Sequence, residues 1–301
     1  MSETIITSSR PVVVGVGLTD ESPYVLRKAL GLIKDPARIV ALHVKDRISV
    51  LSVADPESTM AVEAAQEALN RSTNERLAEL CSTYSIEDWR IASGSPASQL
   101  QHLAQELDAR AIVVGSHGYY GWRAILGETA NSVLYDAPCD VLAIMSRDHA
   151  SEPKTEYKKI LVCTDLSDAT AEVLRAGLIV RQRYGGEISL LSVIKPLRQV
   201  YPGLDTAVLT DPSLTFEHQA ETQMTTQLEQ LCQENAIEDY QVRHGDLARE
   251  VHACVDESGI DLVVMGNHHR HGLKLLTSAA PNEVLHGLTC DLLAVHLQDN
   301  S

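Results

Sequence analysis

The sequence lacks the features that would place a chain in a membrane or in an oxidising compartment. Its first residues, MSETIITSSRP, have no cationic start followed by an apolar core, so we expect no secretory signal peptide. No apolar run approaches the ~18–20 residues that a membrane-spanning helix needs. The six cysteines lie far apart without a Cys-x-x-Cys pair, which indicates reduced, buried thiols rather than a disulfide or zinc framework. We therefore expect a cytoplasmic protein.

Basic residues are scarce relative to acidic ones. Residues 1–150 carry 19 acidic against 13 basic side chains, and residues 151–301 carry 22 against 12, so the net charges are −6 and −10. An acidic surface argues against nucleic acid and anionic membranes as partners, because both attract basic patches. A small anionic ligand in a locally positive pocket is not excluded. Apolar residues make up 44% of the chain, so each half can bury a core.

The sequence does contain a long internal duplication. The segment GSPASQLQHLAQELDARAIVVGSHG, from Gly94, matches GDLAREVHACVDESGIDLVVMGNHH, from Gly245, at an offset of 151 residues and without gaps. Near the start of each half the offset is 148, where VVVGVG from Val12 matches ILVCTD from Ile160. Two copies of one domain are therefore predicted. Their expected bounds are residues 1–148 and 159–301, joined by a linker at 149–158.

Within each copy, short β-branched runs alternate with longer segments of helical spacing. Several of the runs are apolar without alternation, which is typical of parallel strands covered on both faces. The alternation predicts an α/β fold with a doubly wound parallel sheet and right-handed crossovers. In the first half, strands are expected at 12–17, 39–44, 89–92, 111–115 and 141–145, and helices near 22–34, 58–84, 96–108 and 123–136.

A ligand of such a sheet would bind beyond the carboxyl ends of the strands, at the topological switch point. Two segments of each half should reach that region: the turn after the first strand, and the loop after the fourth strand. In the first half this loop is GSHGYYGWRAILGET, from Gly115. Glycines let backbone N–H groups approach a phosphate, and the following helix N-terminus favours an anion. Such glycines more often serve a tight turn, so the loop alone is weak evidence for a ligand.

The segment VVGSHGYYGWRAILGETANSVLYDAPCDVLAI, residues 113–144, resembles the C-terminal third of universal stress protein domains. The resemblance covers nearly the whole chain as two copies. It implies an adenine-nucleotide-hydrolase-like fold with strand order 3-2-1-4-5, and pairing of domains through the last strand. ATP-binding members of that family carry G-x2-G-x9-G followed by Ser or Thr, and an acidic residue that closes the first strand and contacts adenine.

The first copy departs from this pattern. The spacer before Gly127 is eight residues, one short, which resembles the A-type branch that does not depend on ATP. Glu128 replaces the Ser or Thr and would place a carboxylate near phosphate oxygens, at a cost on the order of 1 kcal/mol or more. Gly17 stands where the family has its acidic residue, and Thr129 could only partly replace the hydroxyl. The candidate positions of this copy are Gly17, Val44, Gly115, Gly118, Gly127 and Thr129.

The second copy has the opposite defects. It keeps Asp165 and Ser167 after the first strand, but His269 replaces the second glycine of the loop and Ser278 the third. Pro281 also removes a backbone donor near the helix start. No general base is placed beside the Asp–Ser pair, so a turn or a helix cap is favoured over nucleophilic chemistry. The candidate positions of this copy are Asp165, Ser167, Val193 and Gly266.

A histidine cluster in the second copy admits a metal site as an alternative. His268, His269 and His271 lie in one loop, and transition metals favour imidazole clusters. The triplet has neither helical i, i+4 spacing nor a carboxylate partner, so a solvated surface is favoured over a metal site.

These observations favour a non-enzymatic universal stress protein that acts as a stress-response binding or regulatory module with degraded nucleotide sites. The alternative is an ATP-binding, weakly hydrolysing switch that uses the first domain. We expect no firm cofactor, and ATP is disfavoured. The expected partners are a second copy in a homodimer and an unidentified protein or small-molecule ligand. The strands Val141–Met145 and Leu292–His296 are predicted to pair, because each would otherwise be an apolar edge without Lys, Arg or Pro.

Overall fold

A computed structural model of the chain describes residues 4–45, 56–115, 128–145, 155–195, 212–268 and 280–297. We refer to residues 4–145 as the first half and to residues 155–297 as the second half. The strands of the first half are β1 (Val12–Gly15), β2 (Ile39–Lys45), β3 (Asp88–Ser93), β4 (Ala111–Gly115) and β5 (Asp140–Ile144). The strands of the second half are β6 (Lys159–Cys163), β7 (Glu187–Ile194), β8 (Asp239–His244), β9 (Leu262–His268) and β10 (Asp291–Leu297).

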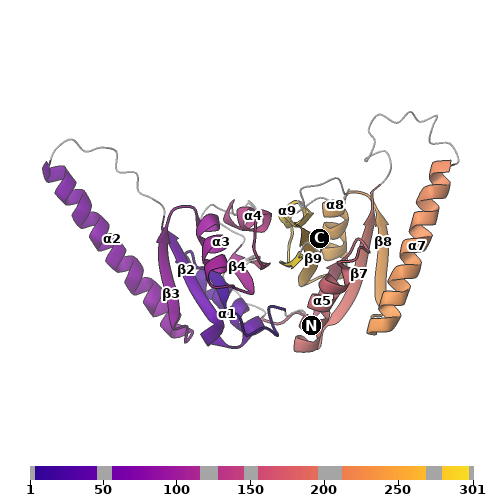
Figure 1. Cartoon of the computed structure of the whole chain (residues 1–301), viewed down its shortest axis with the longest axis horizontal. Coiled ribbons are helices and arrows are strands. Elements are labelled where there is room, and N and C mark those ends of the chain that lie inside the picture. The colour runs from indigo at the N-terminus through magenta and orange to yellow at the C-terminus, as the bar shows by residue number, and fades with distance from the viewer. Residues whose placement is uncertain are drawn as a thin grey trace.

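The described strands form a single ten-stranded sheet with the order β3-β2-β1-β4-β5-β10-β9-β6-β7-β8 (Figure 1). Within each half the neighbouring strands are parallel and follow the order 3-2-1-4-5. The prediction of an α/β fold made of two tandem doubly wound domains is therefore confirmed. The two halves join where β5 pairs with β10 in antiparallel orientation, which confirms the predicted pairing of the last strands.

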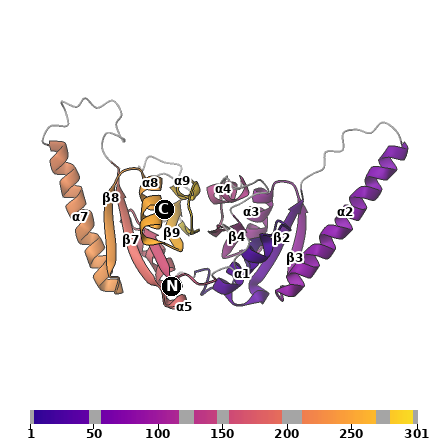
Figure 2. The same cartoon turned by 180° about the vertical axis from the view of Figure 1, so that it is seen from behind.

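Helices cover both faces of the sheet (Figure 2). In the first half they are α1 (Ser22–Ile33), a short 3-10 helix η1 (Pro36–Arg38), α2 (Pro56–Thr83), α3 (Pro96–Glu106) and α4 (Glu128–Tyr135). In the second half they are α5 (Thr170–Tyr184), α7 (Pro212–Asn235), α8 (Leu247–Ser258) and α9 (Ala280–Leu285). Successive strand residues alternate between two buried clusters. Val12 and Val14 belong to the cluster that contains residues of α1, α2, α5 and α7, whereas Val13 belongs to the cluster that contains residues of α3, α4, α8 and α9. Both clusters contain residues of both halves, so the apolar core is continuous across the junction.

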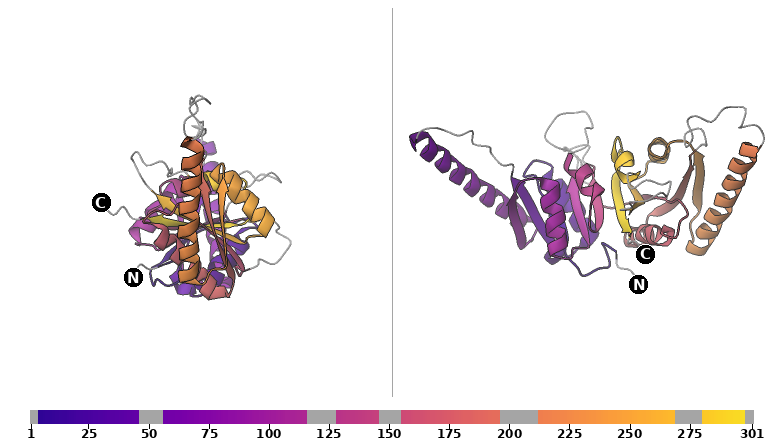
Figure 3. Two further views of the ribbon diagram at one scale, coloured as in Figure 1. Left: turned by 90° about the vertical axis from the view of Figure 1, so that its right-hand side faces the viewer. Right: turned by 45° about the horizontal axis from the view of Figure 1, so that its top comes forward.

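The observed bounds differ slightly from the predicted ones. The first strand, expected to reach Gly17, ends at Gly15, because the chain soon turns and Leu18 has a positive φ of 54°. The helix expected at 123–136 is α4, which begins at Glu128, and its expected first residues lie outside the described part. The long helix expected at 58–84 is α2. Helices α2 and α7 lie at opposite ends of the elongated molecule, with their N-terminal ends leaning away from the sheet (Figure 3).

Two equivalent carboxylates connect the halves at the junction. Asp140 starts β5, and its Oδ1 accepts a hydrogen bond from the backbone N–H of His296 at 2.9 Å. Asp291 starts β10, and its Oδ1 accepts one from the backbone N–H of Met145 at 2.8 Å. The two bonds are related by the 151-residue offset of the duplication, so the junction has a local pseudo-twofold symmetry.

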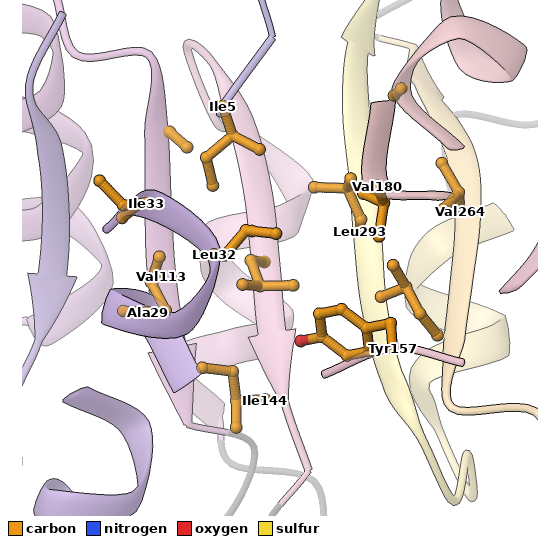
Figure 4. Packing of buried hydrophobic residues seen from close by; sticks show 14 of the residues in the cluster. Ile5, Ala29, Leu32, Ile33, Val113, Ile144, Tyr157, Val180, Val264 and Leu293 are labelled. Carbon is orange, nitrogen blue, oxygen red and sulfur yellow. The ribbon is translucent and has the colours of Figure 1, made fainter. Parts of the chain in front are cut away.

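The end of the expected linker is part of this junction. Tyr157 is fully buried at 0% exposure, among Leu32 and Ile144 of the first half and Leu293 of the second (Figure 4). Its hydroxyl donates to Oδ2 of Asp291 at 2.7 Å. Gly31 of α1 lies against Thr155, where an added Cβ would be 3.0 Å from the Thr155 carbonyl oxygen. Residues 155–158 therefore form a strap that packs between the halves rather than a free connection.

The six cysteines are free and buried, as expected for small hydrophobic side chains. Burial raises the pKa of the thiols of Cys81, Cys139, Cys163, Cys232 and Cys254, which keeps these five protonated and unreactive at neutral pH. Among the residues that the structure describes, no helix is both long and apolar enough to cross a membrane.

Candidate functional site

Each half has its own candidate site at the carboxyl ends of its strands. In the first half it is formed by the turn after β1 and the ends of β2 and β4, and in the second half by the turn after β6 and the ends of β7 and β9. In the first half, the turn after β1 is fixed by local hydrogen bonds. The N–H of Thr19 donates to Oγ of Ser22 at 3.1 Å, and the Ser22 N–H donates to the Thr19 carbonyl at 3.0 Å. Gly17 is exposed, and an added Cβ would meet nothing closer than Thr19 at 3.7 Å. The position therefore has room for a side chain or a ligand.

Gly115 ends β4 close to a carboxylate. A Cβ built on it would lie 3.2 Å from Cγ2 of Val25 and 4.0 Å from Oε2 of Glu21. Glu128 begins α4 and is exposed, and Thr129 is half-buried. The first half thus brings two acidic side chains to the elements that flank the glycine-rich loop. Gly118 and Gly127 belong to that loop and lie outside the described residues.

Polar side chains that the sequence reasoning missed surround the end of β2. Val44 is half-buried near the strand end, and the ammonium of Lys45 donates to Oδ1 of Asn70 in α2 at 2.7 Å. Nδ1 of His43 lies 2.7 Å from the carbonyl oxygen of Val16. The guanidinium of Arg76 donates to the carbonyl oxygen of Leu18 at 2.9 Å. The position of Lys45 directly after Val44 could have marked it, whereas Arg76 comes from a distant helix and gave no local signal.

The corresponding turn of the second half is closed by its own side chains. Oδ1 of Asp165 accepts a hydrogen bond from the N–H of Ser167 at 3.0 Å, and both residues are exposed. Oγ1 of Thr164 accepts from the N–H of Leu166 at 3.0 Å and lies 2.8 Å from Oγ1 of Thr170. Asp165 therefore serves the turn itself, the role that the sequence favoured over nucleophilic chemistry.

The space above Gly266 is filled by the chain. A Cβ on Gly266 would lie 2.6 Å from Cδ1 of Leu297 and 3.3 Å from Cγ2 of Val173. Strand β9 continues past Gly266 to His268, still paired with β10. The buried Asn267 donates from Nδ2 to the carbonyl oxygen of Leu134 in the first half at 2.9 Å. In the second half, the side of Gly266 that a Cβ would occupy is therefore closed by Leu297 and Val173.

The remaining predicted positions of the second half are placed as follows. Val193 is half-buried near the end of β7, at the position equivalent to Val44. Its neighbour Ser192 corresponds to His43, and the Ser192 hydroxyl is buried without a hydrogen-bond partner among the described residues. The backbone of His268 ends β9, and His269 and His271 lie outside the described residues. No group of three or more His, Cys, Asp or Glu within the described ranges could hold a metal ion.

Comparison with known proteins agrees with this geometry. The family model described as "Universal stress protein family" matches the chain twice, over residues 8–144 and 156–296. The chain belongs to the universal stress protein family. Its two matches make it a tandem member, because each covers one five-stranded half of the sheet.

Curated relatives of this universal stress protein are about half its length. Universal stress protein A homolog 1 of Coxiella burnetii is 28% identical over 145 residues, which cover 48% of this chain and 99% of the relative. The Universal stress protein A homolog of Haemophilus ducreyi is 29% identical over 149 residues, with shares of 48% and 99%. A single match in each relative therefore corresponds to one half of the tandem chain.

Solved structures resemble the tandem over its full length. A universal stress protein from Archaeoglobus fulgidus has a TM-score of 0.63 at 18% identity, covering 99% of this chain and 100% of that one. A protein from Pseudomonas aeruginosa PAO1, described as functionally unknown, has a TM-score of 0.62 at 14% identity, with shares of 97% and 94%. At these identities the likeness establishes the fold of the universal stress protein and nothing further about its ligands.

Proposed function

We propose that this universal stress protein is a non-enzymatic, cytoplasmic binding or regulatory module in which neither half retains a complete nucleotide site. The observation that carries the proposal is the filled space at Gly266, where Leu297 and Val173 occupy the approach to the strand end. A phosphate bound by backbone N–H groups needs close access to such a glycine. Leu297 is 5% exposed and lies within the apolar core, so it is not a freely moving surface side chain.

The acidic character of the first half supports the same proposal. Oε2 of Glu21 lies 4.0 Å from the Cβ position of Gly115, and Glu128 adds a second carboxylate at the start of α4. Anions are favoured at a helix N-terminus, and Glu128 already supplies one there. A bound triphosphate would therefore meet like charges on two sides of the loop, each at a cost on the order of 1 kcal/mol.

Hydrolysis is disfavoured by the side chains near the turn after β6. Asp165 lies two residues before the nucleophile-like Ser167, but both are exposed and Oδ1 of Asp165 accepts a hydrogen bond from the Ser167 N–H. A general base needs to reach the proton that it removes, and a metal needs several grouped ligands. Among the described side chains, no group of three or more His, Cys, Asp or Glu could hold such a metal. The proposal is accordingly a protein that acts through binding.

A second candidate function is an ATP-binding switch that uses the first half. It is favoured by the open position at Gly17 and by the ammonium of Lys45 near the end of β2. Lys45 could offset part of the charge of Glu21 and Glu128. The two candidates differ in whether the first half binds nucleotide at cellular concentrations.

Calorimetric titration of the full chain with Mg-ATP tests the proposal. We expect no binding with a dissociation constant in the low-micromolar range, and no nucleotide that copurifies with the protein. A low-micromolar constant that is lost in Lys45→Met would overturn the proposal and support the switch. Turnover above that of a heat-treated sample would separately overturn the non-enzymatic assignment.

The proposal includes self-association as a partner. The junction already joins two similar folds about a pseudo-twofold axis, and near-symmetric assemblies favour closed oligomers such as a dimer of tandems. Light scattering of the full chain at several concentrations tests this, and a strictly monomeric mass would remove the homodimer from the proposal. The client protein or small molecule would be a further partner.

A further inference from the structure

Two ion pairs lie at the junction, and their cations come from non-equivalent positions. Lys28 of α1 pairs across the junction with Asp291, with Nζ 3.0 Å from Oδ2 and side-chain exposures of 7% and 4%. Arg110 pairs within its own half with Asp140 at 2.9 Å, with exposures of 12% and 1%. The two carboxylates correspond to each other in the duplication, whereas their cations occupy unrelated positions.

The duplication shows what each cation faces in the other half. Helices α1 and α5 align at an offset of 148, since the turns that precede them repeat the same hydrogen bond, from Ser22 to Thr19 and from Thr170 to Ser167. Lys28 therefore corresponds to Ala176. Arg110 precedes β4 and corresponds, at an offset of 151, to Asp261 before β9. The second half has neither cation at the equivalent positions.

This asymmetry makes the charge balance depend on which halves are paired. In the observed junction, Lys28 and Arg110 balance Asp140 and Asp291, so these four charges sum to zero. Two first halves paired through β5 would bring together two Lys28, two Arg110 and two Asp140, a net of +2. Two second halves paired through β10 would bring together two Asp291 without these cations, a net of −2.

Tyr157 adds an independent shape difference. Its ring lies under the ammonium of Lys28, 4.5 Å from Nζ, and its hydroxyl donates to Asp291. Its equivalent in the first half, at the 148-residue offset, is Ser9. The contact of Lys28 with an aromatic face therefore forms only when a second half sits against a first half. Burial together with the Asp291 charge raises the pKa of Tyr157, so its hydroxyl stays protonated and can donate a hydrogen bond at neutral pH.

We propose that Lys28, Arg110, Asp140 and Asp291 form a charge code that makes the last-strand surface of each half select the unlike half and reject its own kind. Backbone pairing between β5 and β10 is nearly self-complementary and cannot make this choice, because Leu142 and Leu293 occupy equivalent positions. Leaving a buried charge without its partner is strongly unfavourable. This charge code should make the equilibrium constant for unlike pairing larger than that for like pairing by on the order of a hundredfold or more. A second chain would consequently associate with the tandem through another surface.

The test uses the full chain with a site for a specific protease inserted after Ala150. After cleavage, the two fragments are equilibrated through a brief exposure to mild denaturant, and native mass spectrometry counts the three pairings. The parent should give unlike pairs only. Asp291→Asn removes the surplus negative charge from paired second halves, so this pair should appear. Lys28→Met removes the surplus positive charge from paired first halves, so that pair should appear instead. In the double variant these charges are balanced in all three pairings, so both kinds of like pair should appear together.

Lys34→Met, an exposed position beyond the end of α1, is the matched control and should leave the parent distribution unchanged. Like pairs in statistical proportion in the parent, or single variants that change nothing, would overturn the proposal. A second measurement covers the case in which cleaved fragments unfold. In the uncleaved chain, the effect of Lys28→Met with Asp291→Asn on the unfolding equilibrium constant should differ at least tenfold from the combined effects of the two single variants. Additive effects of the two substitutions would overturn the charge code.

Discussion

Leu142 of β5 lies directly opposite Leu293 of β10, and the two residues occupy the same position in the two copies of the duplicated domain. The neighbouring pairs are crossed in the same sense, with Val141 opposite Ala294 and Ala143 opposite Leu292. A local twofold axis therefore passes between the two leucines. All of these side chains are buried, so a single junction completes both sheets and removes two apolar edges at once.

Proline in either last strand should break this junction. In Ala143→Pro and Ala294→Pro the ring removes a backbone N–H in the middle of a central strand, at a cost of about 3 kcal/mol or more. We expect lower denaturation midpoints and an expanded scattering profile. Ala143→Gly keeps the N–H and is the control, with a smaller loss of stability. If both proline variants stayed as compact and stable as the parent, the strand pairing would not hold the halves together.

The strap should be sensitive to a single methyl group at Gly186. A Cβ there would lie 2.7 Å from the carbonyl oxygen of Tyr157 and 2.8 Å from that of Lys158, and backbone atoms cannot move aside as a flexible side chain can. Gly186→Ala should therefore lower the free energy of unfolding by about 1–3 kcal/mol, as in other overpacked sites. Gly17→Ala, where the space is open, is the control and should be nearly neutral. Equal stability of the two variants would argue against a packed strap.

Much of this architecture follows from local sequence pattern. The alternation of apolar runs with helical segments predicts a doubly wound parallel sheet in each half, the family resemblance implies its strand order, and the bare apolar edges at Val141 and Leu292 predict the join. The strap was not predicted, because Tyr157 sits in a polar, charged segment that resembles a linker. Lys28 also gave no signal, since a lysine in an amphipathic helix is normally exposed and its partner Asp291 lies in the other copy.

The candidate site was predictable only in outline. Position after a strand correctly brought Gly17, Gly115, Asp165 and Gly266 to the carboxyl ends of the strands. The occupants of that region come from elsewhere in the chain. Leu297 reaches Gly266 from the end of another strand, and Glu21 reaches Gly115 from the start of α1. Such contacts depend on tertiary packing, so a motif comparison finds the missing glycines but not the side chains that fill their space.

The buried carboxylate of Asp140 should make stability depend on pH. Burial raises the pKa of Asp140 to about 6, although Arg110 and the His296 N–H act in the opposite direction. Arg10 also lowers it and Glu172 raises it. Because the folded pKa lies above the ordinary value of 3.8, the folded state binds this proton more tightly than the unfolded chain does. The associated stabilisation is complete below about pH 4 and is lost as the pH rises through about 6.

Chemical denaturation of the parent and of Asp140→Asn from pH 4 to pH 7.5 measures this effect. The free energy of unfolding of the parent, relative to the variant, should fall by about 3 kcal/mol across that range. Asp108→Asn is the control, because its carboxylate is largely exposed at 83% and pairs with Arg10 on the surface. A difference between parent and Asp140→Asn that rises with pH would contradict the assignment.

The packing over Gly266 should appear as coupling between two substitutions. Gly266→Ala places a methyl group against Leu297 and should cost about 1–3 kcal/mol. Leu297→Ala removes a buried side chain and should cost about 2–5 kcal/mol. The double variant should lose less than the two single losses together, because the methyl group then enters the space that Leu297 has left. Additive losses in urea denaturation would mean that Leu297 does not occupy the approach to Gly266.

Removing the acidic side chains of the first half should increase its affinity for Mg-ATP. Glu21 lies beside Gly115 and Glu128 begins α4, so Glu21→Gln with Glu128→Ser removes two negative charges from the expected phosphate position. Each charge contributes on the order of 1 kcal/mol, so the affinity measured by calorimetry should rise at least about tenfold. Adding Gly17→Asp restores the acidic residue of the ATP-binding pattern and should strengthen binding further.

Glu87→Gln is the control and should leave the affinity for Mg-ATP unchanged, because Glu87 precedes β3 at the opposite end of the sheet. An unchanged affinity in the charge-removal variant would show that these two carboxylates do not limit nucleotide binding in the first half.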